Sequence, residues 1–355
     1  MRCEENLHYF RAFPALFLVI MILACGNESE RRQEAQTSPA STNVEQTNAL
    51  TLYSGRGAIL IEPLLTRFTD ETGIPIEVRY EKSTQTLANR IAAEGAQTDA
   101  DVFFAQDSGW LGALGEAGHL ATLPTETLDQ VSEHYRDPDG KWIGTSGRAR
   151  VLVYNPERIR AEDLPPTLAD LPRFAKSGRF GWAPGNGSFQ AHVSALRHLW
   201  GEEETRTWLE AMQALEPTVY PKNSPQVRAV DNAEIDIGWV NHYYLHKLRT
   251  SNPELEAANY SFPTAQDAGN LMMLSGVAIM ANSKHSREAQ AFVNYLLTDQ
   301  SQQYFANETF EYPSVSSISL HPDVPPIGDK MIRADQTHLT DLSGTLRVLR
   351  AIGLQ

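Results

Sequence analysis

Two adjacent tyrosines, Tyr243 and Tyr244, are the residues whose type and spacing point most directly to ligand chemistry. Phenolate oxygens are hard donors, which suit a hard, highly charged cation. Free tyrosine has a pKa near 10, but a trivalent cation within bonding distance favours the phenolate. Adjacent side chains converge on one ion only where the backbone turns, and a predicted strand ends here at Val240, just before a predicted helix. The pair indicates a metal site, with packing at a helix start as the alternative.

The loop Pro184–Ser188 is rich in glycine and leads directly into a predicted helix that starts at Phe189. Backbone N–H groups at such a helix start point outward together, so they form a ready binding site for an anion. The loop therefore predicts an anion site, and an ordinary capped helix is the alternative.

His242 and His246 have the i to i+4 spacing that places two potential metal ligands on one helical face. Zinc proteases carry a glutamate directly after the first histidine, whereas this chain has Tyr243 there. The sequence also has no Ser-His-Asp signature, no P-loop and no nucleophile elbow. A zinc hydrolase is therefore the weakest of the functions considered, and we expect no enzymatic activity.

Short apolar strands alternate with amphipathic helices through most of the chain, which is typical of βαβ units and a mostly parallel sheet. An α/β fold is therefore expected. Strands are predicted at 50–53, 76–80, 100–104, 150–154, 180–183, 235–240 and 276–280. Helices are predicted at 59–72, 84–94, 110–116, 189–199, 203–212, from about 242, at 286–297 and at 340–352.

The N-terminal 25 residues are typical of an export signal. The apolar run Ala15–Ala24 is too short to span a bilayer and ends at Cys25, a pattern similar to the lipobox of bacterial lipoproteins. We expect residues 1–25 to be a lipoprotein signal peptide with Cys25 as the lipidation site; an uncleaved anchor or a core helix is the alternative. The polar segment 26–48 is expected to be a flexible tether.

The composition excludes several classes of protein. With Cys3 lost with the signal peptide and Cys25 acylated, no thiol would remain for a disulfide, a cysteine-ligated zinc site or a cysteine nucleophile. A formal net charge of −14 argues against binding to a phosphate backbone, so no nucleic-acid partner is expected. The 355 residues are enough for two ordinary domains.

Seven phrases of the sequence, in the same order, resemble periplasmic ferric-iron-binding proteins of ABC importers. They are Leu50–Arg56, Phe68–Ile74, Ala100–Phe104, Ser146–Asn155, Pro221–Ser224, Val240–Tyr244 and Phe310–Pro313. The resemblance implies a two-lobe fold in which each lobe is a mostly parallel sheet flanked by helices. Strands near 147–154 and 271–280 would cross between the lobes as a hinge.

The resemblance also implies lobe bounds, cargo and partners. Lobe 1 would comprise residues 49–148 and about 275–312, and lobe 2 residues 149–274 and about 313–355. The cargo would be Fe³⁺ with carbonate or phosphate as a synergistic anion, held between the lobes. The protein would be a monomer, lipid-anchored outside the cytoplasm or in the periplasm, and would deliver iron to a permease and its ATPase.

Several site residues follow from the resemblance by position. Tyr243 and Tyr244 would be the metal ligands. The anion would be bound by Asn186, Gly187, Ser188, Asn223 and Asn241. Apart from the resemblance, Arg56 is a candidate to neutralise the anion from the opposite lobe, and a surface arginine beside a turn is the alternative.

The sequence departs from the family in the first lobe. Gly57 and Gln106 occupy the positions where better-studied members supply a histidine and a glutamate as iron ligands. Asp107 is a candidate replacement ligand, and an N-cap for the following helix is the alternative. The departure leaves open a second function, in which the cargo is an organic anion such as a phosphonate, or an iron chelate. Of the hinge arginines Arg148 and Arg150, we expect at least one to be structural.

Overall fold

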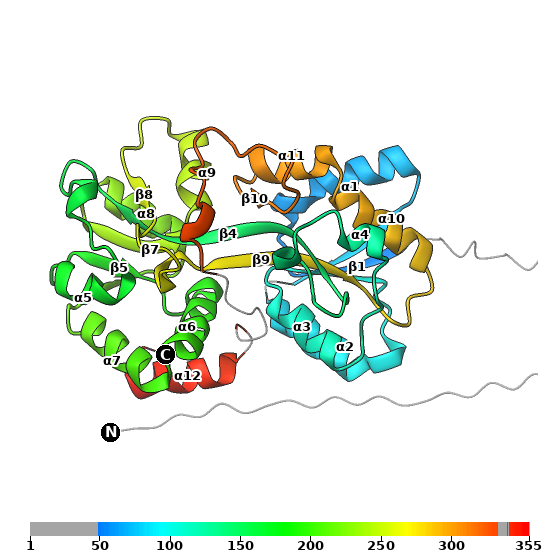
Figure 1. Ribbon diagram of the computed structural model, residues 1–355, viewed down its shortest axis with the longest axis horizontal. Helices are drawn as coiled ribbons and strands as arrows, with labels where there is room; N and C mark the ends of the chain where they lie inside the picture. The colour runs from blue at the N-terminus through cyan, green and yellow to red at the C-terminus, as the bar shows by residue number, and fades with distance from the viewer. Residues whose placement is uncertain (1–48, 82, 333–338, 340, 355) are drawn as a thin grey trace, which may run out of the picture. The chain divides into compact units, whose positions relative to one another are not determined.

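The computed structural model describes residues 49–81, 83–332, 339 and 341–354, and the structural statements below concern these residues (Figure 1). The predicted signal peptide, its Cys25 and the predicted tether lie outside them. None of the helices in the described ranges combines the length and apolar character needed to cross a bilayer.

Ten strands form one sheet in the order β2-β1-β3-β9-β4-β7-β5-β6, with β8 and β10 paired to β4. The strands are β1 (Leu50–Ser54), β2 (Ile76–Tyr80), β3 (Val102–Ala105), β4 (Ile143–Tyr154), β5 (Phe180–Trp182), β6 (Thr218–Val219), β7 (Ile237–Asn241), β8 (Ala258–Tyr260), β9 (Met272–Ile279) and β10 (Tyr312–Pro313). The helices are α1 (Ala58–Thr72), α2 (Thr84–Glu94), α3 (Gly109–Glu116), α4 (Thr125–Leu128), α5 (Leu171–Phe174), α6 (Gly187–Leu199), α7 (Glu202–Gln213), α8 (Asn223–Asp231), α9 (Tyr243–Ser251), α10 (Ser286–Leu296), α11 (Asp299–Asn307) and α12 (Leu342–Ala351).

Each end of the sheet is parallel, and its middle is antiparallel. At one end β1 pairs in parallel with β2 and β3, and at the other β5 pairs in parallel with β6 and β7. Between them β9 pairs antiparallel with β3 and β4, and β4 pairs antiparallel with β7. Figure 1 shows helices gathered around each end, with β4 and β9 running between the two groups. The predicted α/β fold with two lobes and crossing strands is confirmed.

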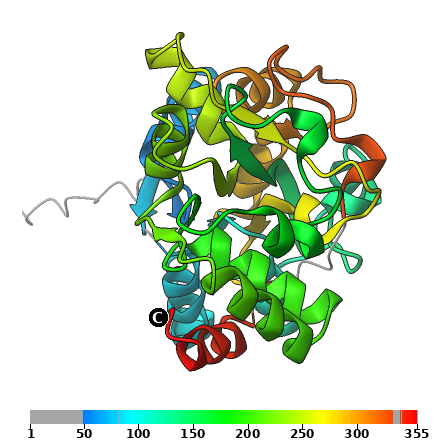
Figure 2. The ribbon, with the colours of Figure 1, turned by 90° about the vertical axis from the view of Figure 1, so that its left-hand side faces the viewer.

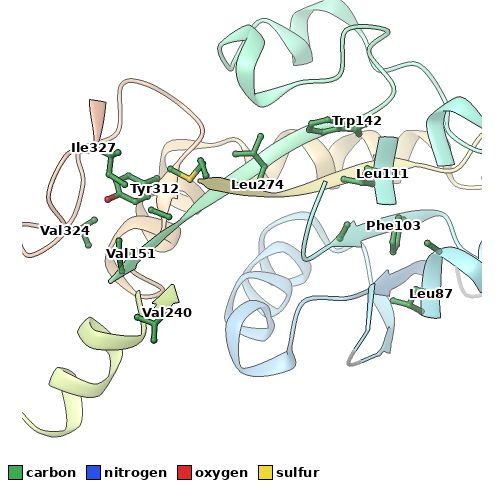
Figure 3. Packing of buried hydrophobic residues seen from close by; sticks show 14 of the residues in the cluster. Leu87, Phe103, Leu111, Trp142, Val151, Val240, Leu274, Tyr312, Val324 and Ile327 are labelled. Atoms are coloured by element: carbon green, nitrogen blue, oxygen red, sulfur yellow. The ribbon is translucent and has the colours of Figure 1, made fainter. Parts of the chain in front are cut away.

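The crossing strands are buried along their whole length. All twelve residues of β4 and all eight of β9 are buried, so this pair can carry side chains toward both ends of the sheet. Figure 3 shows an apolar cluster that follows the pair from Val240 to Leu87. The predicted hinge segments are thus strands in the structure, although β4 begins seven residues before the strand predicted at 150–154.

Edge-to-face aromatic contacts hold the start of helix α6 against strands β5 and β7. The Phe189 ring, in the first turn of α6, lies 5.7 Å from the Trp182 ring and 5.1 Å from the Trp239 ring, centroid to centroid. These three side chains are buried and join α6 to β5 and β7. The start of α6 is therefore held against the strand that precedes the tyrosine pair.

The C-terminal helix α12 packs on α6, as Figures 1 and 2 both show. Ser194 and Thr345 share a hydrogen bond of 2.7 Å between their hydroxyl oxygens, and Arg197 forms an ion pair of 2.8 Å with Asp341. These contacts place the closing helix with the second-lobe elements. The exact bounds of the lobes stay a prediction.

Candidate functional site

The tyrosine pair lies at a sharp change from strand to helix. β7 ends at Asn241 and α9 begins at Tyr243, so the backbone turns at the place where convergence of the two side chains requires it. Asn259 donates a hydrogen bond of 2.8 Å from its Nδ2 to the His242 carbonyl and holds this turn. The rings of Tyr243 and Tyr244 stack with centroids 4.3 Å apart and an interplanar angle of 27°.

Tyr243 is buried, with 5% of its surface exposed, whereas Tyr244 is only partly buried. Burial raises the pKa of Tyr243 well above its ordinary value, and the neighbouring Tyr244 adds to this effect. The positive charge of Arg148 acts in the opposite direction. Without a cation Tyr243 is therefore protonated, and a bound metal ion must displace its proton.

The predicted anion loop forms the capped start of α6. Asn186 is the N-cap residue, and its Oδ1 accepts hydrogen bonds from the Ser188 backbone N–H at 3.1 Å and the Ser188 hydroxyl at 2.6 Å. Asn223, the first residue of α8, donates to the same oxygen at 3.4 Å. Gly187 is exposed beside them. The structure thus brings together four of the five predicted anion donors.

Arg150 connects Asn241, the fifth predicted anion donor, to the four residues at the start of α6 and α8. Its Nη1 donates to Asn241 Oδ1 at 2.9 Å and lies 3.4 Å from the Ser188 hydroxyl and 3.5 Å from Asn223 Oδ1. Its Nη2 donates to the Trp239 carbonyl at 3.0 Å. Sequence reasoning placed Arg150 in the hinge but missed its position among the predicted anion donors.

The charge of Arg150 has no carboxylate partner in the part of the chain that the structure describes. Its side chain is fully buried, and its hydrogen-bond partners are neutral. Burial lowers the pKa of Arg150 to about 9, and Tyr244 and Tyr243 oppose that shift. A buried, uncompensated cation is costly, so this side chain marks a place where an anion would be stabilised.

Arg56 approaches from the first lobe, but it already has a carboxylate partner. Its Nη1 and Nη2 donate to the two carboxylate oxygens of Glu311 at 3.0 and 3.1 Å, and Nη1 also donates to the Ser275 hydroxyl at 2.8 Å. Both charged side chains are fully buried. Burial favours the neutral form of Glu311, but Arg56 and Arg148 outweigh it and hold the Glu311 pKa below its usual value. An anion would have to compete with Glu311 for Arg56.

Asp107 lies between β3 and α3, at the edge where β1 and β3 also end. Burial raises the pKa of Asp107 to about 6, while Arg148 and hydrogen bonds from the Thr84 hydroxyl and the Trp110 backbone oppose the shift. The contact with the Trp110 N–H is that of a carboxylate capping α3. Its predicted role as a metal ligand stays a prediction, and the capping contact supports the alternative.

Neither family position in the first lobe offers a ligand here. Gly57 has no side chain, and nothing lies within 4 Å of the place where a Cβ would be. The Gln106 side-chain oxygen is 3.5 Å from Arg56 Nη1, and its backbone carbonyl accepts hydrogen bonds from Arg148 and Ser275. These two positions therefore add no carboxylate or imidazole ligand to this side of the site.

Arg148 is the second buried arginine of β4. It is 2% exposed, donates from Nη2 to the Gln106 carbonyl, and its Nε has no hydrogen-bond partner among the described residues. Burial lowers its pKa, while the charges of Glu311, Tyr243 and Asp107 oppose that shift. Glu311 is shared with Arg56, and Asp107 is a second nearby carboxylate that acts on Arg148.

The histidine pair has structural contacts. The Ala149 N–H donates to His242 Nδ1 at 3.1 Å, so His242 carries its proton on Nε2 and donates to the Phe310 carbonyl at 2.7 Å. Both ring nitrogens are thus occupied by backbone groups. His246 stacks on Phe310 with centroids 5.6 Å apart. Burial lowers the pKa of both histidines to about 4. Within the described ranges no three His, Cys, Asp or Glu side chains form a potential metal cluster.

Comparison with known proteins agrees with this architecture. Residues 53–303 match the family of bacterial extracellular solute-binding proteins. The Fe(3+)-binding periplasmic protein of Serratia marcescens is 34% identical over 283 residues, which cover 79% of this chain and 83% of that protein.

Two solved structures are similar to this one over most of its length. Iron-bound HitA from Pseudomonas aeruginosa has a TM-score of 0.79 and 36% identity, covering 86% of this chain and 99% of HitA. The Trichodesmium protein IdiA (FutA), in complex with iron and citrate, has a TM-score of 0.75 and 26% identity, covering 86% of this chain and 100% of IdiA. The chain belongs to the bacterial extracellular solute-binding protein family.

Proposed function

We propose that this chain is the substrate-binding component of an ABC importer, and that it carries ferric iron together with an anion between its two lobes. The observation that supports this most is the stacked pair Tyr243 and Tyr244 beside Arg150, a buried cation without a carboxylate. Such a site offers hard oxygen donors for a trivalent ion and a positive charge for its companion anion. Among the similar proteins named above, the Serratia marcescens protein is a Fe(3+)-binding protein and the HitA structure is iron-bound.

The residues divide into two roles. Tyr243 and Tyr244 bind iron as phenolates, and their protons are released when the ion binds. The capped start of α6, with Asn223, Asn241 and Arg150, binds the anion next to the metal. Carbonate and phosphate are the simplest anions for this place. Asp107 remains a candidate for a further metal ligand from the first lobe.

Closure of the lobes would trap the cargo. In two-lobe binding proteins a ligand drives hinge closure through contacts with both lobes. Here the lobes, with bounds near 49–148 plus 275–312 and 149–274 plus 313–355, would close about β4 and β9. The protein would work as a monomer that binds and delivers its cargo without catalysing a reaction.

The proposed place of work is outside the cytoplasm, in the periplasm. A lipid on Cys25 would tether the protein to a membrane, and a permease with its ATPase would receive the iron. No nucleic-acid partner is proposed for a chain of this charge.

The second candidate function keeps the same fold and site but changes the cargo to an iron chelate or another organic anion. The absence of side-chain ligands at Gly57 and Gln106 favours it, because the missing donors could then come from the cargo. The citrate in the Trichodesmium structure is in line with this alternative.

The proposal is tested by equilibrium binding of ferric iron to the purified protein in carbonate or phosphate buffer, with a competing chelator. One tightly bound iron per chain is expected. Tyr243→Phe combined with Tyr244→Phe should weaken binding at least about a thousandfold, the loss of two charged ligands. Tyr260→Phe, a tyrosine that bonds the Pro165 carbonyl, is the matched control and should bind normally. An unaffected double variant would contradict the proposal.

A further inference from the structure

His192 is a fully buried histidine of α6 that lies behind the predicted anion donors. It is four residues after Ser188, so both side chains are on the same face of the helix. The centroid of its ring lies 4.6 Å from that of the Trp239 ring. The guanidinium carbon of Arg150 also lies over the Trp239 ring, 5.1 Å from its centroid. His192 and Arg150 are therefore packed together on one aromatic side chain.

The two hydrogen bonds of His192 are compatible with one protonation state of the ring. Arg150 Nε can only donate, and it lies 3.4 Å from His192 Nδ1, so Nδ1 carries the lone pair. The Ala268 carbonyl can only accept, and it lies 2.6 Å from His192 Nε2, so Nε2 carries the proton. Burial lowers the His192 pKa well below its ordinary value, and the charge of Arg150 adds to this effect while the bond to Ala268 opposes it. The ring is thus neutral and presents an acceptor to Arg150.

The guanidinium group of Arg150 has different partners on its two sides. Nε and Nη2 donate to His192 Nδ1 and to the Trp239 carbonyl, and neither of these acceptors belongs to a predicted anion donor. Nη1 instead faces three of the predicted anion donors, Ser188, Asn223 and Asn241. An anion at the start of α6 would compete for the bonds of Nη1 and would leave those of Nε and Nη2 in place. His192 therefore holds the side of Arg150 that an anion does not use.

Ala268 connects this contact to the hinge. It begins the short helical turn Ala268–Asn270, which directly precedes β9. The Arg150 backbone N–H donates to the Leu271 carbonyl at 2.9 Å, so the main chain of Arg150 also contacts the entry to β9. The side chain reaches the same segment through His192. These contacts fix the guanidinium group relative to α6, β4 and β9 at once.

We infer that His192 is a positioning residue of the anion site, which holds the Arg150 guanidinium with Nη1 directed at the start of α6 and so raises the affinity for the anion without touching it. The inference rests on the proposed function and deepens its account of the anion. A guanidinium group that is already fixed loses little conformational entropy when an anion binds. Without His192 the long Arg150 side chain must be ordered by the anion itself, and that cost lowers the anion affinity.

The test compares two substitutions of His192. His192→Phe keeps a ring on Trp239 but removes the acceptor for Arg150 and the donor to Ala268. His192→Asn places an amide oxygen near the position of Nδ1, so it can still accept from Arg150 but cannot reach Ala268. Ferric iron binding is titrated with phosphate, and separately with carbonate, to give the anion concentration at half-saturation. That concentration should rise at least about fivefold in His192→Phe and stay within about twofold of the wild type in His192→Asn.

A double-mutant cycle shows whether His192 acts through Arg150. In the Arg150→Gln background, His192→Phe should leave the anion dependence of iron binding unchanged, because the group that His192 positions is already absent. His198→Asn changes an exposed histidine of the same helix and should behave as the wild type. Urea titrations of each variant measure the loss of stability separately from the loss of anion affinity. Should His192→Phe not fold, His192→Gln, whose amide can keep the bond to Ala268, takes its place.

The outcomes distinguish the inference from the function on which it rests. An unchanged half-saturating anion concentration in the folded His192→Phe protein would overturn the positioning role. So would equal weakening in His192→Asn and His192→Phe, or the same loss in the presence and absence of Arg150, since packing alone would then explain the effect. A wild-type protein that binds no ferric iron at any phosphate or carbonate concentration would instead overturn the proposed function itself.

Discussion

The two halves of the site use opposite chemistry. The second-lobe half presents oxygen and amide groups, namely the tyrosine pair and the capped start of α6, around the unpaired cation Arg150. The first-lobe half presents Arg56, Arg148 and Glu311, which are largely satisfied by one another and by backbone groups. The second half is arranged to receive a ligand, whereas the first half is mainly an internally balanced set of charges.

This difference between the two halves indicates which of them would contribute most of the free energy of cargo binding. Buried groups without partners gain most from a ligand, because the cost of their burial is paid whether or not the ligand is present. Groups that already have partners gain little. The account therefore predicts that the second lobe binds most of the cargo and that the first lobe encloses it.

The largest expected effect tests whether the first-lobe charges are structural. Glu311→Gln leaves Arg56 buried without its counter-ion, so the free energy of unfolding should fall by about 3–5 kcal/mol in urea titrations. The double variant Arg56→Met with Glu311→Leu removes both charges and should recover much of that loss. If the single variant were as stable as the wild type, the balanced-charge view of this half would be wrong.

The next largest expected effect is the pH dependence of stability that arises from His242 and His246. These two side chains connect β4 and α9 to the segment after α11. Both have folded-state pKa values near 4, below the ordinary value of 6.5. Between these values the unfolded chain takes up protons that the folded chain does not, so stability should fall as pH drops from about 6.5 to 4.

Each histidine should account for up to about 3 kcal/mol of this loss, and denaturant titrations across that pH range measure it. His246→Phe keeps the ring stack on Phe310 and should remove about half of the pH dependence. His134→Gln, at an exposed ring, is the control. A flat stability profile between pH 6.5 and 4.5 would contradict the assignment of both histidines as neutral and structural.

Arg150 provides the sharpest test of the second-lobe half. Arg150→Gln should weaken ferric iron binding about tenfold to a hundredfold, because the anion loses its buried cation. The dependence of iron affinity on carbonate or phosphate concentration should shrink as well. Arg158→Gln, which removes an arginine paired with Asp236, should change neither quantity. Unchanged anion dependence in Arg150→Gln would remove Arg150 from the anion site.

The smallest expected effect is the loss of stability when a helix N-cap is removed, and it can be compared between the two halves. Asn186→Ala and Ser83→Ala each remove an N-cap side chain and should cost about 1 kcal/mol of stability. Only Asn186→Ala should also weaken iron binding at limiting anion, since only that cap lies at the proposed anion site. Equal iron affinities in the two variants would argue against a role for the α6 start beyond capping.

Local sequence patterns predicted most elements and the strand and helix ends at which the tyrosine pair and the glycine-rich loop lie. The tyrosine pair lies at a strand end followed by a helix start, which are both local signals, and the glycine-rich loop before Phe189 is another. The start of β4 was missed because Gly144 and Gly147 have low strand propensity. There the Met272 sulfur lies 2.5 Å from where a Cβ of Gly147 would be, so close packing on β9 favours glycine.

The remaining features depend on contacts that no local pattern reveals. Arg56 and Glu311 are 255 residues apart in the chain, so their ion pair follows from the fold alone. The position of Arg150 among Ser188, Asn223 and Asn241 likewise requires three segments to meet. The helix α8 was missed because Asn223, Ser224 and Pro225 at its start favour a turn, although proline is tolerated in a first helical turn.

The most direct test of the central claim is the visible absorption spectrum of the protein titrated with ferric iron at neutral pH. If Tyr243 and Tyr244 bind the ion as phenolates, an orange-red charge-transfer band should grow to one iron per chain, and both Tyr→Phe changes together should abolish it. A protein that binds iron without this band, or keeps the band in the double variant, would contradict the account.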